Sequence, residues 1–292
     1  MVENLGINTI HVTVDQLKTL GLGRVEMCLG RHGTHNERLA KMEGDIQRAQ
    51  MLNIPFSIHL PMYIFDWFDG DYLDVFFLDS DLDKRELSYK LLEENLKRVS
   101  LLKPDYCVLH FAGVYGNVCG TFDDFKDVLK EAFQRINNMG KQYDVHILLE
   151  YMGSNIRFSD YKDWISGTKS LSHVGLLVDT GHLYFASLIH NFDYMEALDK
   201  LSSVAEAFHL WTTKGYGTYG DSEYYQKFHH IIPHVDQLSS EGWAFDTEAV
   251  LERIAREDRP MIIEASTVYK GGDYFYEGVA SIISLLEGNI TR

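Results

Sequence analysis

The sequence of 292 residues is short of cysteine, proline and long apolar runs, and each shortage excludes a class of protein. Its three cysteines, Cys28, Cys107 and Cys119, cannot form a paired disulfide framework, which indicates a reducing compartment. Five prolines and 23 glycines are too few for a collagen-like or low-complexity chain. No apolar run reaches the ~18–20 residues of a membrane span, and the first residues do not resemble a signal peptide. We therefore expect a cytoplasmic protein with no membrane partner.

Basic side chains are also scarce. The chain has 27 Lys and Arg against 43 Asp and Glu, a formal net charge of −16 at pH 7. Nucleic-acid affinity comes largely from cations that neutralise phosphates, so an acidic surface repels polyanions over long range. The charge balance therefore argues against nucleic acid as a partner.

The sequence does contain a regular alternation of short apolar runs and amphipathic stretches, with no linker between them. The runs are mostly continuous, as in parallel strands buried on both faces. They lie at Leu5–His11, Arg24–Gly30, Phe56–Met62, Tyr106–Gly113, Val145–Met152, Gly175–His182, Ala207–Thr212 and Met261–Ala265. Eight strand–helix units predict an α/β fold, a single (β/α)8 TIM barrel over residues 1–292. An open doubly wound sheet is the alternative, weakened because no Gly-rich phosphate loop follows a strand.

The stretches between the strands carry apolar residues at helical spacing. Helices are predicted over 87–99, 125–136, 249–254 and 279–286. Thr121, Asp246 and Asp273 are the predicted start signals of the last three, and Pro104 ends the first. His35 is expected to begin a further helix after the second strand.

Polar side chains follow six consecutive predicted strands, the third to the eighth. In a barrel of this kind the chemistry lies at the carboxyl ends of the strands. These ends carry His59, His110, Glu150, Asp179 with His182, His209, and Glu264. Any one of them has an ordinary explanation as a helix cap or a solvated loop residue. Six in a row on one rim, all of ligand types for zinc, manganese or cobalt, favour a metal centre.

The order of these segments resembles the xylose isomerase-like TIM-barrel superfamily, which includes sugar isomerases, sugar epimerases and the endonuclease IV family. The most specific segment is VDTGHLYFA (Val178–Ala186), similar to an Asp-Thr-x-His signature after the sixth strand. The segments HLP, LHFAG, LLEYMG, FHLW and IIEAS follow the expected order along nearly the whole chain. The resemblance implies the barrel fold and a divalent metal cofactor, and it leaves the reaction open.

Resemblance to the isomerases and epimerases implies that the chain binds one divalent ion, which is zinc, manganese, cobalt or magnesium. By this resemblance its ligands are Glu150, Asp179, His209 and Glu264. Such an ion polarises the carbonyl and hydroxyl oxygens of a sugar. Glu150 and Glu264 would then double as catalytic base and acid, and His182 would bind a substrate hydroxyl. The implied partner is a small carbohydrate or polyol.

The endonuclease IV pattern instead implies two or three zinc ions and hydrolysis of a phosphoester. His59 and His110 would hold one ion with Glu150, and a third ion would use His182 and an Asp-x-His pair after the seventh strand. The loop in question reads YYQKFHHIIPHVDQ and contains no Asp-x-His. The candidate ligands there are His229, His230 and His234. The incomplete third site and the acidic charge make DNA cleavage the less favoured alternative; a barrel that binds metal without catalysis is a further one.

Two loops are predicted to set the substrate. In residues 64–81, Trp67 is a candidate for closing over a sugar ring, with a contact between subunits of a homo-oligomer as the alternative. In residues 212–234, Lys214 is a candidate for binding a phosphate or carboxylate, and ordinary solvation is the alternative. Arg31 and His32 are weaker candidates for the same task.

Glu26 lies inside the second predicted strand. A buried carboxylate there would need a partner, and the sequence does not identify one. It is given no catalytic role.

Overall fold

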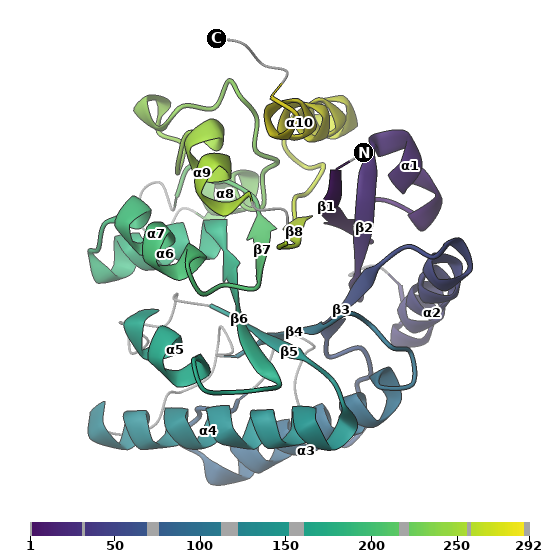
Figure 1. Ribbon diagram of the computed structural model, residues 1–292, viewed down its shortest axis with the longest axis vertical. Helices are drawn as coiled ribbons and strands as arrows, with labels where there is room; N and C mark the ends of the chain where they lie inside the picture. Colours follow the sequence, from purple (N-terminus) through teal and green to yellow (C-terminus); the bar gives the residue numbers. More distant parts are fainter. Residues whose placement is uncertain are drawn as a thin grey trace.

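Eight parallel strands close into a barrel in which each strand pairs with the next and β8 pairs with β1 (Figure 1). The computed structural model describes residues 2–30, 33–68, 76–111, 122–151, 161–215, 222–255 and 258–288. The strands are β1 (Val2–Asn8), β2 (Leu22–Met27), β3 (Phe56–Leu60), β4 (Cys107–His110), β5 (Ile147–Glu150), β6 (Val174–Asp179), β7 (Ala207–Leu210) and β8 (Met261–Ile263). The predicted (β/α)8 barrel is confirmed, and the open sheet is wrong.

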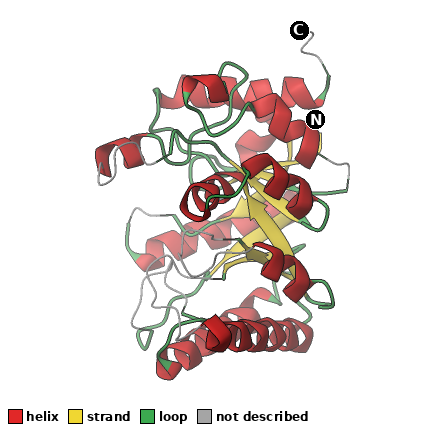
Figure 2. Ribbon diagram, turned by 90° about the vertical axis from the view of Figure 1, so that its left-hand side faces the viewer, coloured by secondary structure: helices red, strands yellow, loops and turns green. Residues whose placement is uncertain are grey.

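Helices surround the strands on the outside of the barrel (Figure 2). The described α-helices are α1 (Leu17–Leu20), α2 (His35–Leu52), α3 (Leu82–Val99), α4 (Phe122–Tyr143), α5 (Tyr161–Thr168), α6 (Thr180–His190), α7 (Tyr194–Ser202), α8 (Ser222–Lys227), α9 (Thr247–Ile254) and α10 (Gly271–Leu286). Two short 3-10 turns are η1 (Val14–Gln16) and η2 (Ser239–Glu241). No helix in the described part of the chain is long and apolar enough to cross a membrane.

Most predicted helices are confirmed, and their boundaries show which start signals act. His35 begins α2, where the Thr34 side chain accepts from the Glu37 backbone N–H and Glu37 accepts in return from Thr34. Asp246 is the N-cap residue of α9. The prediction for Asp273 is wrong by two residues, because α10 begins at Gly271. Thr121 lies outside the described residues.

The predicted strands run too far at their carboxyl ends. The sixth was expected to reach His182, but β6 ends at Asp179 and α6 begins at the next residue. The cause is local: the Asp179 carboxylate accepts a hydrogen bond of 2.7 Å from the backbone N–H of His182, which caps the helix. A candidate functional residue therefore also ends its own strand.

Strand alternation determines which side chains face the interior of the barrel. Successive side chains point to opposite faces, so residues two apart share one face. Val108, Leu148, Leu177 and Ala207 belong to a separate buried cluster with Tyr106, and each of the four precedes a polar residue of the candidate site by two positions. The polar residues thus lie as a layer above this apolar layer.

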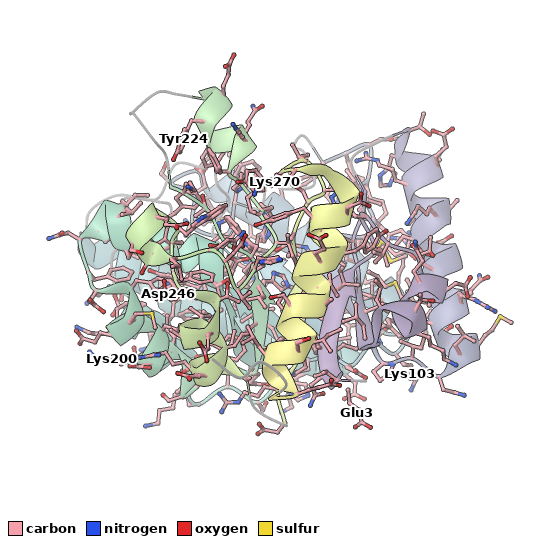
Figure 3. The ribbon with its side chains drawn as sticks, turned by 90° about the horizontal axis from the view of Figure 1, so that it is seen from above. Glu3, Lys103, Lys200, Tyr224, Asp246 and Lys270 are labelled. Atoms are coloured by element: carbon pink, nitrogen blue, oxygen red, sulfur yellow. The ribbon has the colours of Figure 1, made fainter. Side chains whose placement is uncertain are left out.

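The register and the loops place that polar layer at one end of the molecule. His110 of β4 lies beside Glu150 of β5, and Asp179 of β6 lies beside His209 of β7. Figure 3 shows Tyr224 and Lys270, which follow β7 and β8, at one end of the barrel. Glu3, near the start of β1, lies at the opposite end. The polar layer faces the end that carries the strand-to-helix loops.

Candidate metal centre

Four of the predicted ligands meet at the mouth of the barrel. Glu150, Asp179, His209 and Glu264 each offer one donor atom, and these atoms all lie within 4.8 Å of one another. They come from the ends of β5 and β6, from within β7, and from the residue after β8. The first three are fully buried, whereas the Glu264 side chain keeps 12% of its surface exposed. The barrel thus brings together four residues that are spread over more than a hundred positions of sequence.

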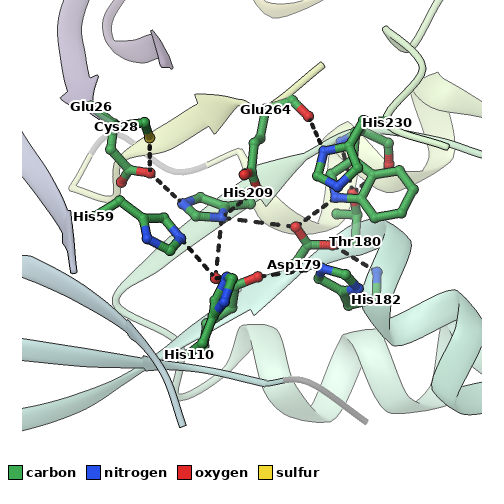
Figure 4. Close-up of polar contacts among 12 residues, drawn as sticks. Glu26, Cys28, His59, His110, Asp179, Thr180, His182, His209, His230 and Glu264 are labelled. Atoms are coloured by element: carbon green, nitrogen blue, oxygen red, sulfur yellow. Dashed lines mark hydrogen bonds and ion pairs between the residues drawn. The ribbon is translucent and has the colours of Figure 1, made fainter. Parts of the chain in front are cut away.

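His209 lies at the centre of the group (Figure 4). Its Nδ1 is 2.9 Å from Glu264 Oε2, and 3.7 and 3.8 Å from Glu150 Oε2 and Asp179 Oδ2. Its Nε2 faces the other way, 3.0 Å from Glu26 Oε1. One ring nitrogen therefore faces the three carboxylates of the candidate centre, and the other faces a fourth.

The electrostatics of the group show an excess of buried negative charge. Burial, together with Glu150 and Glu264, raises the pKa of Asp179 well above its usual value. Burial also opposes ionisation of Glu150, but His110 and His209 outweigh it and hold the pKa of Glu150 well below its usual range. Buried carboxylates of this kind need a cation beside them.

Several atoms of the group are buried without a hydrogen-bond partner. They are both carboxylate oxygens of Glu150, both ring nitrogens of His209 and Oε2 of Glu264. Buried polar atoms are normally paired, and unpaired ones mark strain, function or an ion. One imidazole nitrogen and three carboxylates form a donor set suited to zinc or manganese, so these residues fit a divalent cation.

Asp179 is held rigidly for such a role. Its Oδ2 accepts a hydrogen bond of 2.6 Å from Trp211 Nε1, while its Oδ1 caps α6. The Thr180 hydroxyl donates to the Trp211 carbonyl and accepts from the Trp211 backbone N–H. Trp211 is fully buried, and it fixes the direction of the Asp179 carboxylate.

Gly181 is required for this arrangement, and its replacement gives a first testable prediction. A Cβ at Gly181 would lie 2.4 Å from the indole carbons of Trp211, which is closer than real contacts allow. Gly181→Ala is expected to destabilise the metal-free protein by about 1–3 kcal/mol, as overpacking of a core does. Denaturant unfolding measures the effect. The matched control is Gly44→Ala in α2, where nothing lies within 4 Å and the change is expected to stabilise. Equal effects of the two changes would contradict the prediction.

A second donor group adjoins the first. Donor atoms of His59, His110 and Glu150 also lie within 4.8 Å of one another. His110 Nε2 is 3.1 Å and His59 Nε2 is 3.4 Å from the same Oε2 atom of Glu150. Glu150 therefore belongs to both groups and is placed where it can bridge two ions.

The remaining predicted histidines fall into two pairs, and the first pair, His182 and His230, lies next to the candidate centre. His182 Nε2 is 3.7 Å from Glu150 Oε1, and burial lowers the pKa of His182 to about 4, so its ring is neutral at pH 7. His230 stacks on Trp211 at 4.2 Å, and its Nδ1 is 2.7 Å from the carbonyl oxygen of Glu264. His182 and His230 thus border the candidate centre.

His229 and His234 make other contacts. His229 packs edge-on against Trp211, and its Nε2 is 3.1 Å from the Tyr225 hydroxyl. His234 Nδ1 is 2.8 Å from Asp236 Oδ1, and its ring stacks on Tyr274. None of the contacts described for His234 joins it to the four donors.

The candidate loop residues are held by neighbours outside the donor group. Lys214 Nζ donates to the carbonyl of Glu241 and lies 4.7 Å from the ring centre of Trp243. Trp67 stacks on Phe65, and the ammonium of Lys90 lies 4.1 Å from its ring centre. In the described ranges no contact joins Lys214 or Trp67 to the centre. Arg31 and His32 fall outside those ranges.

The structure adds one residue to the predicted site. Glu26 is fully buried, and besides its contact with His209 it accepts a hydrogen bond of 3.0 Å from the Ser57 hydroxyl. The partner that a buried carboxylate at this position needs is thus His209, which lies on β7. The only sequence signal was a single acid inside an apolar strand.

Comparison with known proteins supports the architecture. The family model described as xylose isomerase-like TIM barrel matches residues 14–282. No curated protein sequence matches significantly.

Solved structures with the same fold cover nearly the whole chain. 3-keto-D-glucoside 4-epimerase from E. coli is 11% identical (TM-score 0.59), covering 96% of this chain and 99% of its own. The IOLI protein with a bound zinc atom is 13% identical (TM-score 0.63; 99% and 100% covered). Endonuclease IV from Thermus thermophilus is 14% identical (TM-score 0.57; 98% and 99% covered). At these identities the likeness shows the fold alone. From the family match over 14–282, the chain belongs to the xylose isomerase-like TIM barrel family.

Proposed function

We propose that this protein is a divalent-metal-dependent isomerase or epimerase acting on a sugar or a similar polyol. The observation that carries the proposal is the convergence of Glu150, Asp179, His209 and Glu264 at the barrel mouth, within 4.8 Å of one another. The fold similarity to a sugar epimerase and to a zinc-containing protein supports it. The acidic surface supports a small uncharged substrate over a polyanion.

The proposed roles follow from burial and charge. A bound divalent ion supplies polarisation of adjacent carbonyl and hydroxyl oxygens. Glu150 and Glu264, whose carboxylates both face Nδ1 of His209, serve as the base and acid that move a proton between neighbouring carbons. Glu264 is the more accessible of the two. His182, neutral at pH 7, binds a substrate hydroxyl through its ring nitrogen.

The test is metal content followed by a substrate panel. Elemental analysis is made on protein purified without chelator or nickel resin, and the protein is then incubated with ketoses and aldoses in D₂O. About one manganese, cobalt, magnesium or zinc ion per chain, with deuterium entering a sugar C–H position, supports the proposal. A chain that takes up no metal even after reconstitution would refute it.

The second donor group favours one other candidate function. His59, His110 and Glu150 add a site for a second ion beside the first. Two ions about 3.5–4 Å apart are a common arrangement for phosphoester hydrolysis. Two or three zinc ions per chain, with turnover of a small chromogenic phosphodiester, would support this function over isomerisation.

Replacing His110 separates the two candidates. Under the one-ion proposal, His110→Ala is expected to leave the metal content at one ion per chain, because His110 belongs only to the second group. Mass spectrometry under native conditions measures the content, and His209→Ala is the control that loses the ion. A fall from two ions to one in His110→Ala would favour the hydrolase.

A further inference from the structure

Glu26 on β2 is a buried charge that the proposed chemistry does not use. Its side chain has no exposed surface, and both of its oxygens are engaged. Oε2 accepts from the Ser57 hydroxyl at 3.0 Å, and Oε1 lies 3.0 Å from His209 Nε2, with Cys28 Sγ 3.8 Å away. Burying a carboxylate in the barrel interior costs free energy unless the carboxylate is paired. We therefore expect Glu26 to have a specific role.

The orientation of the His209 ring indicates what this role is. Only one nitrogen of a neutral imidazole has a free lone pair, and the hydrogen bond made by the other nitrogen determines which one it is. Nδ1 faces Glu150, Asp179 and Glu264, whereas Nε2 faces Glu26 (Figure 4). To bind an ion through Nδ1, the ring must carry its proton on Nε2. Glu26 is the acceptor placed for that proton.

We propose that Glu26 is a positioning residue of the metal centre: its carboxylate accepts a hydrogen bond from the Nε2–H of His209 and thereby keeps Nδ1 free and aimed at the ion. This inference rests on the proposed metal site. A carboxylate behind a ligating histidine fixes its tautomer and ring orientation and raises its basicity. Glu26 and His209 are at hydrogen-bonding distance, although the ring N–H does not point straight at the oxygen.

A ligand role for Glu26 itself is the competing explanation. Donor atoms of Glu26, His59 and His209 do lie within 4.8 Å of one another. However, His59 Nε2 is directed to Glu150 Oε2 at 3.4 Å, and its Nδ1 is 3.2 Å from the Leu60 carbonyl oxygen. The other oxygen of Glu26 is already bound by Ser57. These contacts favour a proton, rather than an ion, between Glu26 and His209.

The test is zinc affinity measured by competition with a chromogenic chelator. Glu26→Gln keeps the shape but offers a weaker acceptor, and Glu26→Ala offers none. We expect zinc to bind about 10–100-fold more weakly to these variants than to the wild type, and the loss of affinity to be larger in Glu26→Ala than in Glu26→Gln. The matched control is Glu206→Gln, because Glu206 forms the same kind of pair with His146 (2.6 Å) before β7, and its loss is expected to leave zinc affinity unchanged. Circular dichroism confirms that each variant is folded.

A second readout does not depend on how the variants fold. In ¹⁵N spectra of the zinc-loaded wild type, His209 is expected to be protonated on Nε2 and to bind zinc through Nδ1. Protonation on Nδ1 would overturn the inference, as would wild-type zinc affinity in folded Glu26→Gln and Glu26→Ala. Either result leaves the proposed function standing. A wild type that binds no zinc or other divalent ion would overturn both.

Discussion

Glu150→Gln and Glu264→Gln are each expected to lower kcat for sugar isomerisation by about 10²–10⁴-fold, the contribution of a positioned acid or base. The amide keeps the size and most contacts of the side chain, but it neither takes up nor releases a proton. Both residues also belong to the candidate ligand set, and His209 Nδ1 lies 2.9 Å from Glu264 Oε2 and 3.7 Å from Glu150 Oε2. A variant that loses the ion would therefore show the same fall in kcat as a variant that loses only the acid or base.

Assays at saturating metal, with metal content determined on the same sample, separate the two effects. Incorporation of solvent deuterium then reports proton transfer directly. Glu206→Gln is the control, since Glu206 is half exposed at the amino end of β7, away from the mouth. If either glutamine variant with a full complement of metal turned over at the wild-type rate, that residue would not be the acid or base.

The barrel was predictable because two simple periodicities repeat along the chain. Apolar runs predict strands buried on both faces, and the apolar spacing of 87–99 or 249–254 predicts the helices between them. The rim residues followed from the same pattern, because parallel strands end on one side and side chains alternate. His110 and Glu150, or Asp179 and His209, become neighbours once the strands are in register.

What the sequence did not reveal depends on contacts between distant segments. Glu26 precedes His209 by more than 180 residues, and only closure of the barrel places β2 and β7 around the same interior. The direction of a long side chain is equally hidden. Lys214 lies on a predicted substrate loop, yet its ammonium faces Trp243 and the carbonyl of Glu241. Strand ends were overestimated because the capping of α6 by Asp179 competes with extension of β6.

Metal removal is expected to have the largest effect on stability. Three carboxylates crowd around one imidazole in the ion-free centre, and burial together with the charges of Glu150 and Glu264 raises the pKa of Asp179. A ligand that binds only the folded state at 100 times its Kd stabilises by about 2.7 kcal/mol. For a chain of this size that corresponds to a rise in Tm of roughly 4–5 °C. Differential scanning calorimetry with and without chelator, then with zinc or manganese restored, measures the shift.

The same experiment on Asp179→Asn gives the decisive contrast. The amide removes one charge from the ligand set. Its single oxygen can accept either from the backbone N–H of His182, which caps α6, or from Trp211 Nε1, and its NH₂ group cannot accept from the other donor. The metal-free variant is therefore expected to unfold at a lower Tm than the metal-free wild type, so the response to metal is measured against each protein's own metal-free Tm. Metal should then raise Tm much less than in the wild type, because the ion loses a charged ligand. Glu206→Gln, by comparison, should keep the full response, since its pairing with His146 lies outside the centre. An equal metal response in Asp179→Asn and the wild type would place the ion elsewhere, and the second group of His59, His110 and Glu150 would then become the primary site.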